Sequence, residues 1–262
     1  MGRKNAYLGG IIGADPLVPY DEHWDKVVLL MDGTDKEEDL SDSNQTVTET
    51  NTLPVLSNEV DPFGNTVDVL DFDRVVGTAI SGIQVASSAI QFGTSPFTIE
   101  MWVKVASTAD PQYLYSDRQS SGNYVMFRIE NNGTLRFFRG VVGGNVQGSF
   151  SSTATLSTGT WHHVALTRDG SDLRMFLDGA EVATSSQSIV SFNSGTPPVL
   201  GYDPSSTNSA NPYYSGQLAG QMAQVRVTKG VARYTAAFTP PTASFPTTSA
   251  PALRETGIFN LG

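Results

Sequence analysis

The chain of 262 residues contains no cysteine. This absence excludes disulfide bonds, thiolate nucleophiles and cysteine-ligated metal sites, so the fold must be held together by packing and hydrogen bonds. Charged residues are also few, at 16%, and no basic run offsets the formal net charge of −10. An acidic surface repels phosphate backbones, so we expect no nucleic acid partner. Because no apolar stretch is long enough to cross a membrane, we also expect no membrane insertion.

Glycine and proline are abundant, with 25 and 14 residues. Both residues favour turns, and the segments between them are short and rich in β-branched and aromatic side chains. Many short strands joined by turns are typical of all-β sandwiches, and sandwiches of about 200–250 residues commonly form one domain. We therefore predict an all-β fold with one main domain.

Apolar runs and alternating patterns indicate where the strands lie. They predict strands within residues 24–35, 67–73, 96–105, 124–140, 161–184 and 221–228. In the third of these, Thr98, Glu100, Trp102 and Lys104 should share one face of the strand. Asn132-Gly133 predicts a two-residue hairpin turn. The polar stretch 36–50 is expected to be a loop, and residues 142–160 and 185–196 to be loops or irregular edge strands.

Residues 159–185, "GTWHHVALTRDGSDLRMFLDGAEVATS", hold two of the three histidines side by side. The pattern predicts strands at 161–168, 173–177 and 180–184, joined by turns at Asp169-Gly170 and Asp178-Gly179. Neighbouring residues of a strand point to opposite faces, so His162 and His163 cannot ligate one ion together. We interpret Asp169, Asp172 and Asp178 as turn residues, and expect Trp161 and one histidine in the sandwich interior.

The chain divides into three parts. Residues 1–23 lack periodicity but carry apolar side chains, which predicts an arm that gains structure by docking on a partner. An all-β sandwich domain should follow over residues 24–246, and a proline-punctuated tail over residues 247–262. The side chains expected to dock the arm are Tyr7, Leu8, Ile11, Ile12 and Leu17.

Several stretches carry a resemblance to a known family. They are "WDKVVLLMDGTD", "DVLDFD", "FTIEMWVKV", "GTWHHVALTRDG", "LRMFLDG" and, most specifically, "VRVTKGVARYTAAFTPPTASFP". In this order they resemble the laminin G-like, concanavalin A-type jelly rolls of bacteriophage tail and other virion proteins, from residue 24 to about residue 246. The resemblance implies two stacked antiparallel sheets. It also implies a virion protein, either tail-fibre-associated or a capsid decoration, whose arm binds other virion proteins, with a homo-oligomer left open.

The resemblance does not fix an activity, because this fold hosts lectins, glycosidases, adhesion modules and structural domains. Hydrolases of the fold carry closely spaced carboxylates, as Glu-x-Asp-x-(x)-Glu, on one strand. That motif is absent, and no nucleophile elbow surrounds a serine. We therefore expect a non-enzymatic protein with no catalytic residue and no cofactor.

A carbohydrate-binding module that recognises a host-surface glycan is the competing hypothesis. Sugar binding typically uses an aromatic platform beside amide and carboxyl groups. Loop 201–216 supplies Tyr202, Asp203, Asn211, Tyr213 and Tyr214, and the loop expected at 110–124 adds Tyr113, Tyr115, Asp117, Arg118 and Asn123. Tyrosines are also frequent where loops or subunits pack together, and we weight packing above glycan binding.

Calcium is the metal that the resemblance implies for related jelly rolls. Its candidate ligands are Asp32, Asp35, Asp71 and Asp73. The resemblance also implies an Asp-Glu pair where this chain has Ala223-Gln224, and this departure argues against a calcium site. We therefore expect no metal. A last cluster, Arg226, Lys229, Arg233 and Tyr234, should either recognise an anion or tie down the tail.

Overall fold

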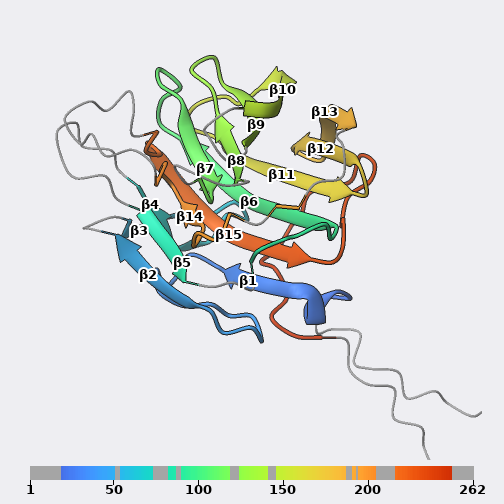
Figure 1. Cartoon of the computed structure of the whole chain (residues 1–262). Coiled ribbons are helices and arrows are strands. Elements are labelled where there is room, and N and C mark those ends of the chain that lie inside the picture. Colours follow the sequence, from blue (N-terminus) through green and yellow to red (C-terminus); the bar gives the residue numbers. More distant parts are fainter. Residues whose placement is uncertain are drawn as a thin grey trace, which may run out of the picture.

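The computed structural model describes residues 19–50, 54–72, 82–86, 90–118, 124–140, 146–186, 191–192, 194–204 and 216–249. This part of the chain contains fifteen strands and one short 3-10 turn, η1 (Trp24–Lys26). The strands form two antiparallel sheets of eight and seven strands (Figure 1). The predicted all-β jelly-roll sandwich is confirmed.

The eight-stranded sheet runs in the order β13-β12-β11-β6-β15-β4-β3, and β1 also pairs with β15. Its strands are β1 (Val27–Met31), β3 (Val55–Val60), β4 (Thr66–Asp71), β6 (Phe97–Val105), β11 (Trp161–Asp169), β12 (Asp172–Leu177), β13 (Ala180–Ser186) and β15 (Gly220–Lys229). The meander predicted for residues 161–184 is present as β11, β12 and β13.

The seven-stranded sheet runs in the order β10-β9-β8-β7-β14-β5-β2. Its strands are β2 (Thr46–Thr50), β5 (Gly82–Ala86), β7 (Gln112–Ser116), β8 (Tyr124–Ile129), β9 (Thr134–Gly140), β10 (Val146–Thr155) and β14 (Val199–Leu200). The edge strand β10 shows two register irregularities against β9. It therefore matches the irregular edge strand expected within residues 142–160.

The core lies between the two sheets. Strand β6 shows how the sequence builds it, because Phe97, Ile99, Met101, Val103 and Val105 are all fully buried in the main apolar cluster. Each such side chain contributes about 1.5–3 kcal/mol through the hydrophobic effect. The alternate residues of β6, from Thr98 to Lys104, point away from the seven-stranded sheet, onto what we call the outer face of the eight-stranded sheet.

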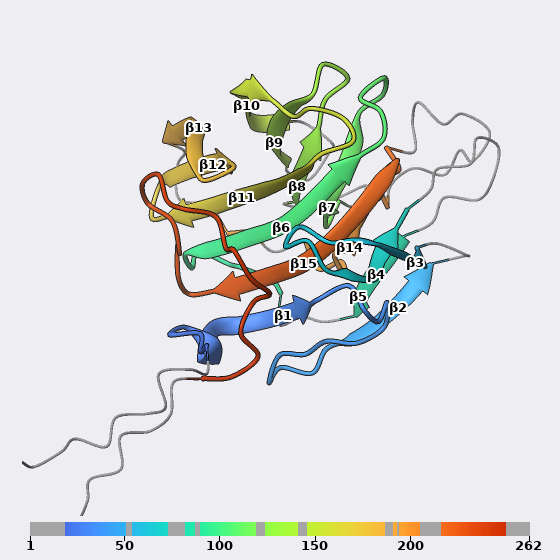
Figure 2. The same cartoon turned by 180° about the vertical axis from the view of Figure 1, so that it is seen from behind.

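Two segments cover this outer face. Residues 231–249, here called the crossing segment, run from the end of β15 to the β12–β13 turn and from there back across the sheet to β1 (Figure 2). Phe238 N donates to Gly179 O at 2.9 Å at one end, and Phe245 packs with Trp24 near the other. The β3–β4 hairpin reaches over from the opposite side, where the ring of Phe63 lies 5.9 Å from that of Trp102.

Two stretches expected to be loops are strands. Thr46–Thr50 forms β2. Its Val47 is buried and the threonines on either side of Val47 are exposed, a pattern that suits an edge strand. Gln112–Ser116 forms β7, which is buried throughout. The loop prediction was wrong in both places because each strand is short and is flanked by turn-forming residues, so its strand pattern was not recognised.

Two turns differ by one residue from their predictions. Glu130 N donates to Thr134 O at 2.8 Å, so the β8–β9 hairpin has a three-residue loop closed by Gly133 at φ +80. Asp169 pairs with Asp172, which leaves Gly170-Ser171 as the β11–β12 loop. The Asp178-Gly179 turn is as predicted, with φ +50 and +79.

Candidate functional site

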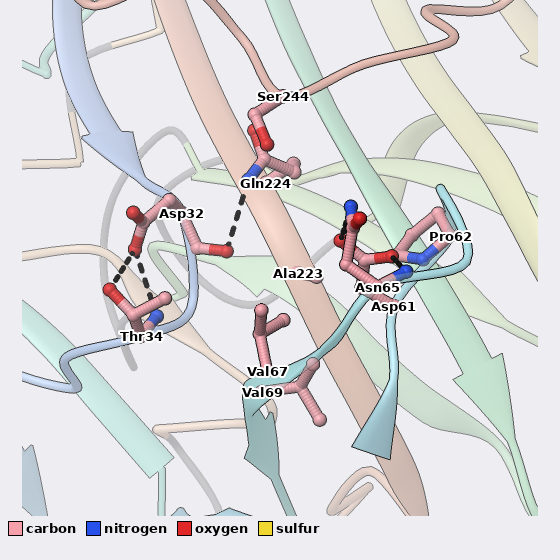
Figure 3. A pocket seen from close by; sticks show the side chains of 10 residues that line it. All are labelled: Asp32, Thr34, Asp61, Pro62, Asn65, Val67, Val69, Ala223, Gln224 and Ser244. Atoms are coloured by element: carbon pink, nitrogen blue, oxygen red, sulfur yellow. Dashed lines mark hydrogen bonds between the residues drawn. The ribbon is translucent and has the colours of Figure 1, made fainter. Parts of the chain in front are cut away.

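A polar pocket opens on the outer face, between the crossing segment and the β3–β4 hairpin (Figure 3). Its enclosed volume is about 100 Å³, which is small for a ligand pocket, and about 400 Å³ is reached only when the space open to solvent is counted. Ten residues from five segments line it: Asp32, Thr34, Asp61, Pro62, Asn65, Val67, Val69, Ala223, Gln224 and Ser244.

The pocket exists because β4 and β15 separate. Their pairing is limited to Gln221 with Asp71 and Met222 with Leu70. Immediately afterwards β15 bulges, and Gln224 adopts φ +52, an unusual value for a residue other than glycine. Three hydrogen bonds hold Gln224 there, because its backbone N and its Nε2 both donate to Asp32 O at 3.2 Å and its Oε1 accepts from Phe245 N at 2.7 Å.

The walls carry two carboxylates held by their own turns. Asp32 Oδ1 accepts hydrogen bonds from the backbone N and the Oγ1 of Thr34, both at 2.8 Å. Across the pocket, Asp61 Oδ1 accepts from Phe63 N at 2.9 Å and from Asn65 N at 2.7 Å. These bonds fix the direction of both carboxylates before any ligand arrives.

Several hydrogen-bonding atoms of the pocket remain unengaged within the described part of the chain. Asp32 Oδ2, Asn65 Oδ1 and Ser244 Oγ make no hydrogen bond there. The side chains of Val67 and Val69 add an apolar surface (Figure 3). The pocket can therefore accept hydrogen bonds from a small polyhydroxylated ligand while its apolar surface contacts C–H groups.

The candidate calcium ligands do not converge. Asp32 lines the pocket, whereas Asp71 lines a separate cavity and accepts from Gln221 Nε2 at 3.3 Å. Asp35 Oδ1 accepts from Glu37 N at 2.8 Å, and Asp73 lies outside the described residues. The described residues contain no group of three or more histidine, aspartate or glutamate side chains arranged to hold a metal. The three described aspartates therefore do not fit a shared calcium site.

Two members of the tyrosine-rich loop are buried. Tyr202 is 7% exposed, and its hydroxyl lies 3.4 Å from Thr50 Oγ1. Asp203 is 3% exposed and accepts from Arg118 Nη1 at 2.8 Å. Both side chains pack against the domain here. The other candidates, Asn211, Tyr213, Tyr214 and Asn123, lie outside the described residues.

The second tyrosine-containing segment is not an exposed platform either. Tyr113 and Tyr115 belong to β7 and are 5% and 1% exposed. Asp117, just after β7, is 1% exposed and accepts from Val125 N at 2.6 Å. The expectation of an exposed aromatic loop at residues 110–118 was wrong because this segment is an inner strand of the seven-stranded sheet.

The two adjacent histidines lie on opposite faces of β11, as predicted. His163 is fully buried beneath the crossing segment, with Nε2 3.2 Å from Glu100 Oε2. His162 is partly exposed, with Nδ1 2.7 Å from Asp178 Oδ2. Trp161 is half-buried on the outer face, and its Nε1 donates to Val60 O at 2.8 Å. The expectation that Trp161 and one histidine lie in the sandwich interior was therefore wrong, because Trp161 and the buried His163 both lie on the outer face.

The basic cluster at the end of β15 belongs to a buried charge network that we call the clasp, formed by Asp21, Glu100, Arg226 and Arg233. Arg226 donates to Glu100 and to Asp21, each at 2.8 Å, and Arg233 donates twice to Asp21, at 2.8 and 2.9 Å. The partners of Arg226 and Arg233 are thus carboxylates of the amino-terminal segment and of β6, while the ring of Phe245 in the crossing segment lies 3.8 Å from the guanidinium carbon of Arg226.

Electrostatics support these ion pairs of the clasp. Burial alone would raise the pKa of Glu100, but the charge of Arg226 and the hydrogen bond from His163 hold that pKa well below its ordinary value. The pKa of Asp21 is also lowered, because bonding to Arg233 and the charges of both arginines outweigh burial. Asp21 N also donates to Thr248 O at 2.9 Å, so the clasp holds residues from both ends of the described chain side by side.

The residues proposed to dock the arm, Tyr7, Leu8, Ile11, Ile12 and Leu17, lie outside the described residues. Within the described part of the chain, no helix is long and apolar enough to span a membrane.

Of the pocket residues, the sequence analysis singled out Asp32 and the Ala223-Gln224 position, but not Asp61, Asn65 or Ser244. The turn sequence Asp61-Pro62-Phe63-Gly64-Asn65 was the signal that could have drawn attention to the hairpin.

Comparisons with known proteins agree with the architecture. Residues 78–232, more than half of the chain, match the family model described as the concanavalin A-like lectin/glucanases superfamily. No curated protein matches the sequence. Domain 4 of AbnA, an extracellular arabinanase from Geobacillus stearothermophilus, in complex with arabinotriose, is similar with a TM-score of 0.57 and 14% identity, over 79% of this chain and 94% of that chain.

A second solved structure is a protein from Bacteroides ovatus proposed to bind carbohydrate. It is similar with a TM-score of 0.42 and 23% identity, over 54% of this chain and 39% of that chain. This chain therefore matches about two fifths of the length of that protein. At these identities the likeness to solved structures shows the fold alone.

Proposed function

The chain belongs to the concanavalin A-like lectin/glucanases superfamily, and on this premise we propose that it is a non-catalytic, carbohydrate-binding jelly roll. The observation that carries the proposal is the outer-face pocket, where unengaged oxygen acceptors stand beside an apolar surface. Sugars present hydroxyl donors around a ring with apolar C–H faces, so they match both parts of this lining.

The structural neighbour with arabinotriose supports the choice of ligand class, since it pairs this fold with a bound oligosaccharide. A fold likeness does not transfer a site, so the proposal rests on the pocket. The lining includes no histidine, lysine or tyrosine that could move a proton, and its two carboxylates are each engaged in their own turns. These features favour binding over glycoside hydrolysis.

Binding to a glycan array, followed by titration calorimetry on the glycans retained, tests the proposal. Ser244→Trp places an indole at the mouth of the pocket from an exposed position and should weaken binding at least about tenfold. Thr242→Trp, also exposed on the crossing segment but outside the lining, is the matched control and should bind as the wild type does. If no glycan binds, or if both variants bind equally well, this proposal is wrong.

We further propose that the protein is a structural component of a bacteriophage virion, either tail-fibre-associated or a capsid decoration. The resemblance of residues 24–246 to such proteins supports this, and so does the clasp, which anchors Asp21 near the end of the proposed docking arm. A jelly roll that is fixed to a particle and binds sugar would contact a host-surface glycan.

Deleting residues 1–18 tests attachment to the particle. Particles assembled with the shortened chain should lack this protein, and a particle reconstruction that shows it at normal occupancy would contradict the proposal.

A further inference from the structure

We propose that the outer-face pocket selects an uncharged sugar unit and rejects acidic sugars such as uronic acids. The inference rests on the proposed function and concerns the same pocket. It follows from the lining, which contains two carboxylates, Asp32 and Asp61, and no cationic side chain. A carboxylate on the ligand would meet two like charges with no counterion in the wall.

Cations on the neighbouring strands do not change this balance. Arg226 lies two positions beyond Gln224 on β15, but its guanidinium is bound to Asp21 and Glu100, each at 2.8 Å. Lys104 of β6 lies 3.5 Å from Glu59. Both of these cations therefore already have carboxylate partners, and an anionic ligand would have to break one of those pairs to gain a cation.

The hydrogen-bonding capacity points the same way. Asp32 Oδ2 and Asn65 Oδ1 can only accept hydrogen bonds, and Asp61 Oδ2 receives only a 3.2 Å contact from Asn65 Nδ2. The hydroxyl of Ser244 can also donate, and Asn65 Nδ2 and Gln224 Nε2 each have a second N–H besides the one that is bonded. An uncharged sugar supplies a donor at each hydroxyl, whereas a uronic acid replaces one hydroxymethyl donor with a carboxylate that only accepts. The lining therefore offers an acidic sugar only neutral donors, and these stand beside two carboxylates.

The test compares matched pairs, galactan with polygalacturonate and other neutral glycans with their uronate counterparts, on an array and then by calorimetry at low salt. We expect the wild type to bind the uncharged member at least about tenfold more tightly, since like charges at close range cost on the order of 1–2 kcal/mol. The gap should narrow as salt screens the repulsion.

Two variants test whether the pocket carboxylate Asp32 causes the preference for uncharged sugars. Asp32→Asn keeps an oxygen acceptor for the turn but removes one charge, so it should reduce the preference for the uncharged member several-fold while binding of that member persists. Asp35→Asn removes a carboxylate from the same loop outside the pocket and should leave the preference unchanged.

The outcomes separate the two proposals. If acidic glycans bind as tightly as their neutral counterparts, or if Asp32→Asn leaves the preference unchanged, this inference is overturned while sugar binding stands. If no glycan of either kind binds, the proposed function fails and the inference fails with it.

Discussion

At the scale of single residues, His162 and His163 show how strand alternation separates identical neighbours. His163 is fully buried and lies edge-on to the rings of Trp102 and Phe238, with centroids at 5.3 and 5.6 Å. His162 instead bonds to Asp178 and to Ser157 at the rim of the domain. The pair therefore has two unrelated structural roles, and neither requires a shared ion.

We expect His163→Ala to lower the free energy of unfolding by about 2–4 kcal/mol, because it opens a buried space and removes a hydrogen bond to Glu100. His162→Ala should cost about 1 kcal/mol, since only rim hydrogen bonds are lost. Urea unfolding of the two variants at neutral pH measures the difference. Equal losses, or zinc binding that both variants abolish, would contradict this account.

Asp117 is a buried carboxyl group whose environment changes its chemistry. Its Oδ1 accepts from Val125 N, but its Oδ2 has no partner in the described structure. Burial raises the pKa of Asp117 to about 7, although the hydrogen bond from Val125 N opposes that rise. The folded protein therefore holds a proton here that the unfolded chain releases near pH 4.

This raised pKa predicts the pH dependence of stability. Because the native state binds the extra proton, the contribution of Asp117 should fall as pH rises from about 4 to about 7 and stay constant above that range. Asp117→Asn removes the dependence, so relative to the wild type it should gain about 2 kcal/mol between pH 5 and pH 8.

Denaturant unfolding at both pH values checks this prediction for Asp117. Asp169→Asn, at an exposed strand end, is the control and should follow the wild type at both pH values. The same pH difference in wild type and Asp117→Asn would show that the side chain is ionised in the native state.

At the scale of elements, the β12–β13 turn and the crossing segment depend on each other. Gly179 O accepts from Phe238 N at 2.9 Å, and a Cβ at Gly179 would lie 2.0 Å from Phe238 O. Phe238 in turn stacks on Tyr234 with ring centroids 3.5 Å apart. A glycine at this turn is thus required by close approach as well as by its positive φ.

Gly179→Ala should destabilise the protein by at least about 2 kcal/mol more than Gly170→Ala. Both glycines have positive φ in a hairpin loop, at +79 and +58, so the cost of the left-handed backbone is common to both. A Cβ at Gly170 meets nothing within 4 Å, whereas at Gly179 it collides with backbone.

Urea unfolding gives the difference between the two glycine variants, and hydrogen exchange at the Phe238 amide shows whether the crossing segment has detached. Equal losses without faster exchange at that amide would mean that the segment does not rely on this contact.

Local patterns were sufficient to predict much of the fold. Strand β6, the β11–β13 meander and β15 carry strong alternation or clear turns, which are properties of a few adjacent residues. Strand β2 was missed because Val47 is its only apolar residue, and its place in the sheet comes from pairing with β5, far along the chain. The cover over the outer face likewise depends on distant contacts.

The pocket was less accessible to prediction. Its lining comes from the loop after β1, the β3–β4 hairpin, β15 and the crossing segment, and the local sequence around each lining residue predicts only a turn or a strand. Asp61, for example, has the sequence context of a turn former, and the structure shows that it is one. Only the separation of β4 from β15 gives these residues a common space, and no local pattern encodes that separation.

At the scale of the whole molecule, stability should not depend on calcium. Asp32 and Asp71 face different cavities, and Asp35 is engaged in its own turn. Thermal melts in millimolar calcium chloride and in chelator should therefore agree within about 2 °C, because a ligand that does not bind the native state cannot stabilise it. A large rise in melting temperature with calcium would reveal a site that these carboxylates do not form.

The clasp also determines how many amino-terminal residues can be deleted before the domain loses stability. Asp21 lies within the stretch expected as an arm, yet it is 4% exposed and bonds to both Arg226 and Arg233. A chain lacking residues 1–18 keeps Asp21 and should unfold at the wild-type urea midpoint. A chain lacking residues 1–23 leaves two buried guanidinium groups with Glu100 alone, and removing one partner of a buried ion pair costs about 3–5 kcal/mol.

Asp21→Ala in the full chain should reproduce most of the loss expected on removing residues 1–23. Asp25→Ala, which removes only an exposed pair with Lys26, should change little. If the two truncated chains unfold at the same midpoint, the clasp does not stabilise the domain. If instead both truncations fail to load onto particles but only the longer one is destabilised, attachment and stability belong to different parts of the first 23 residues.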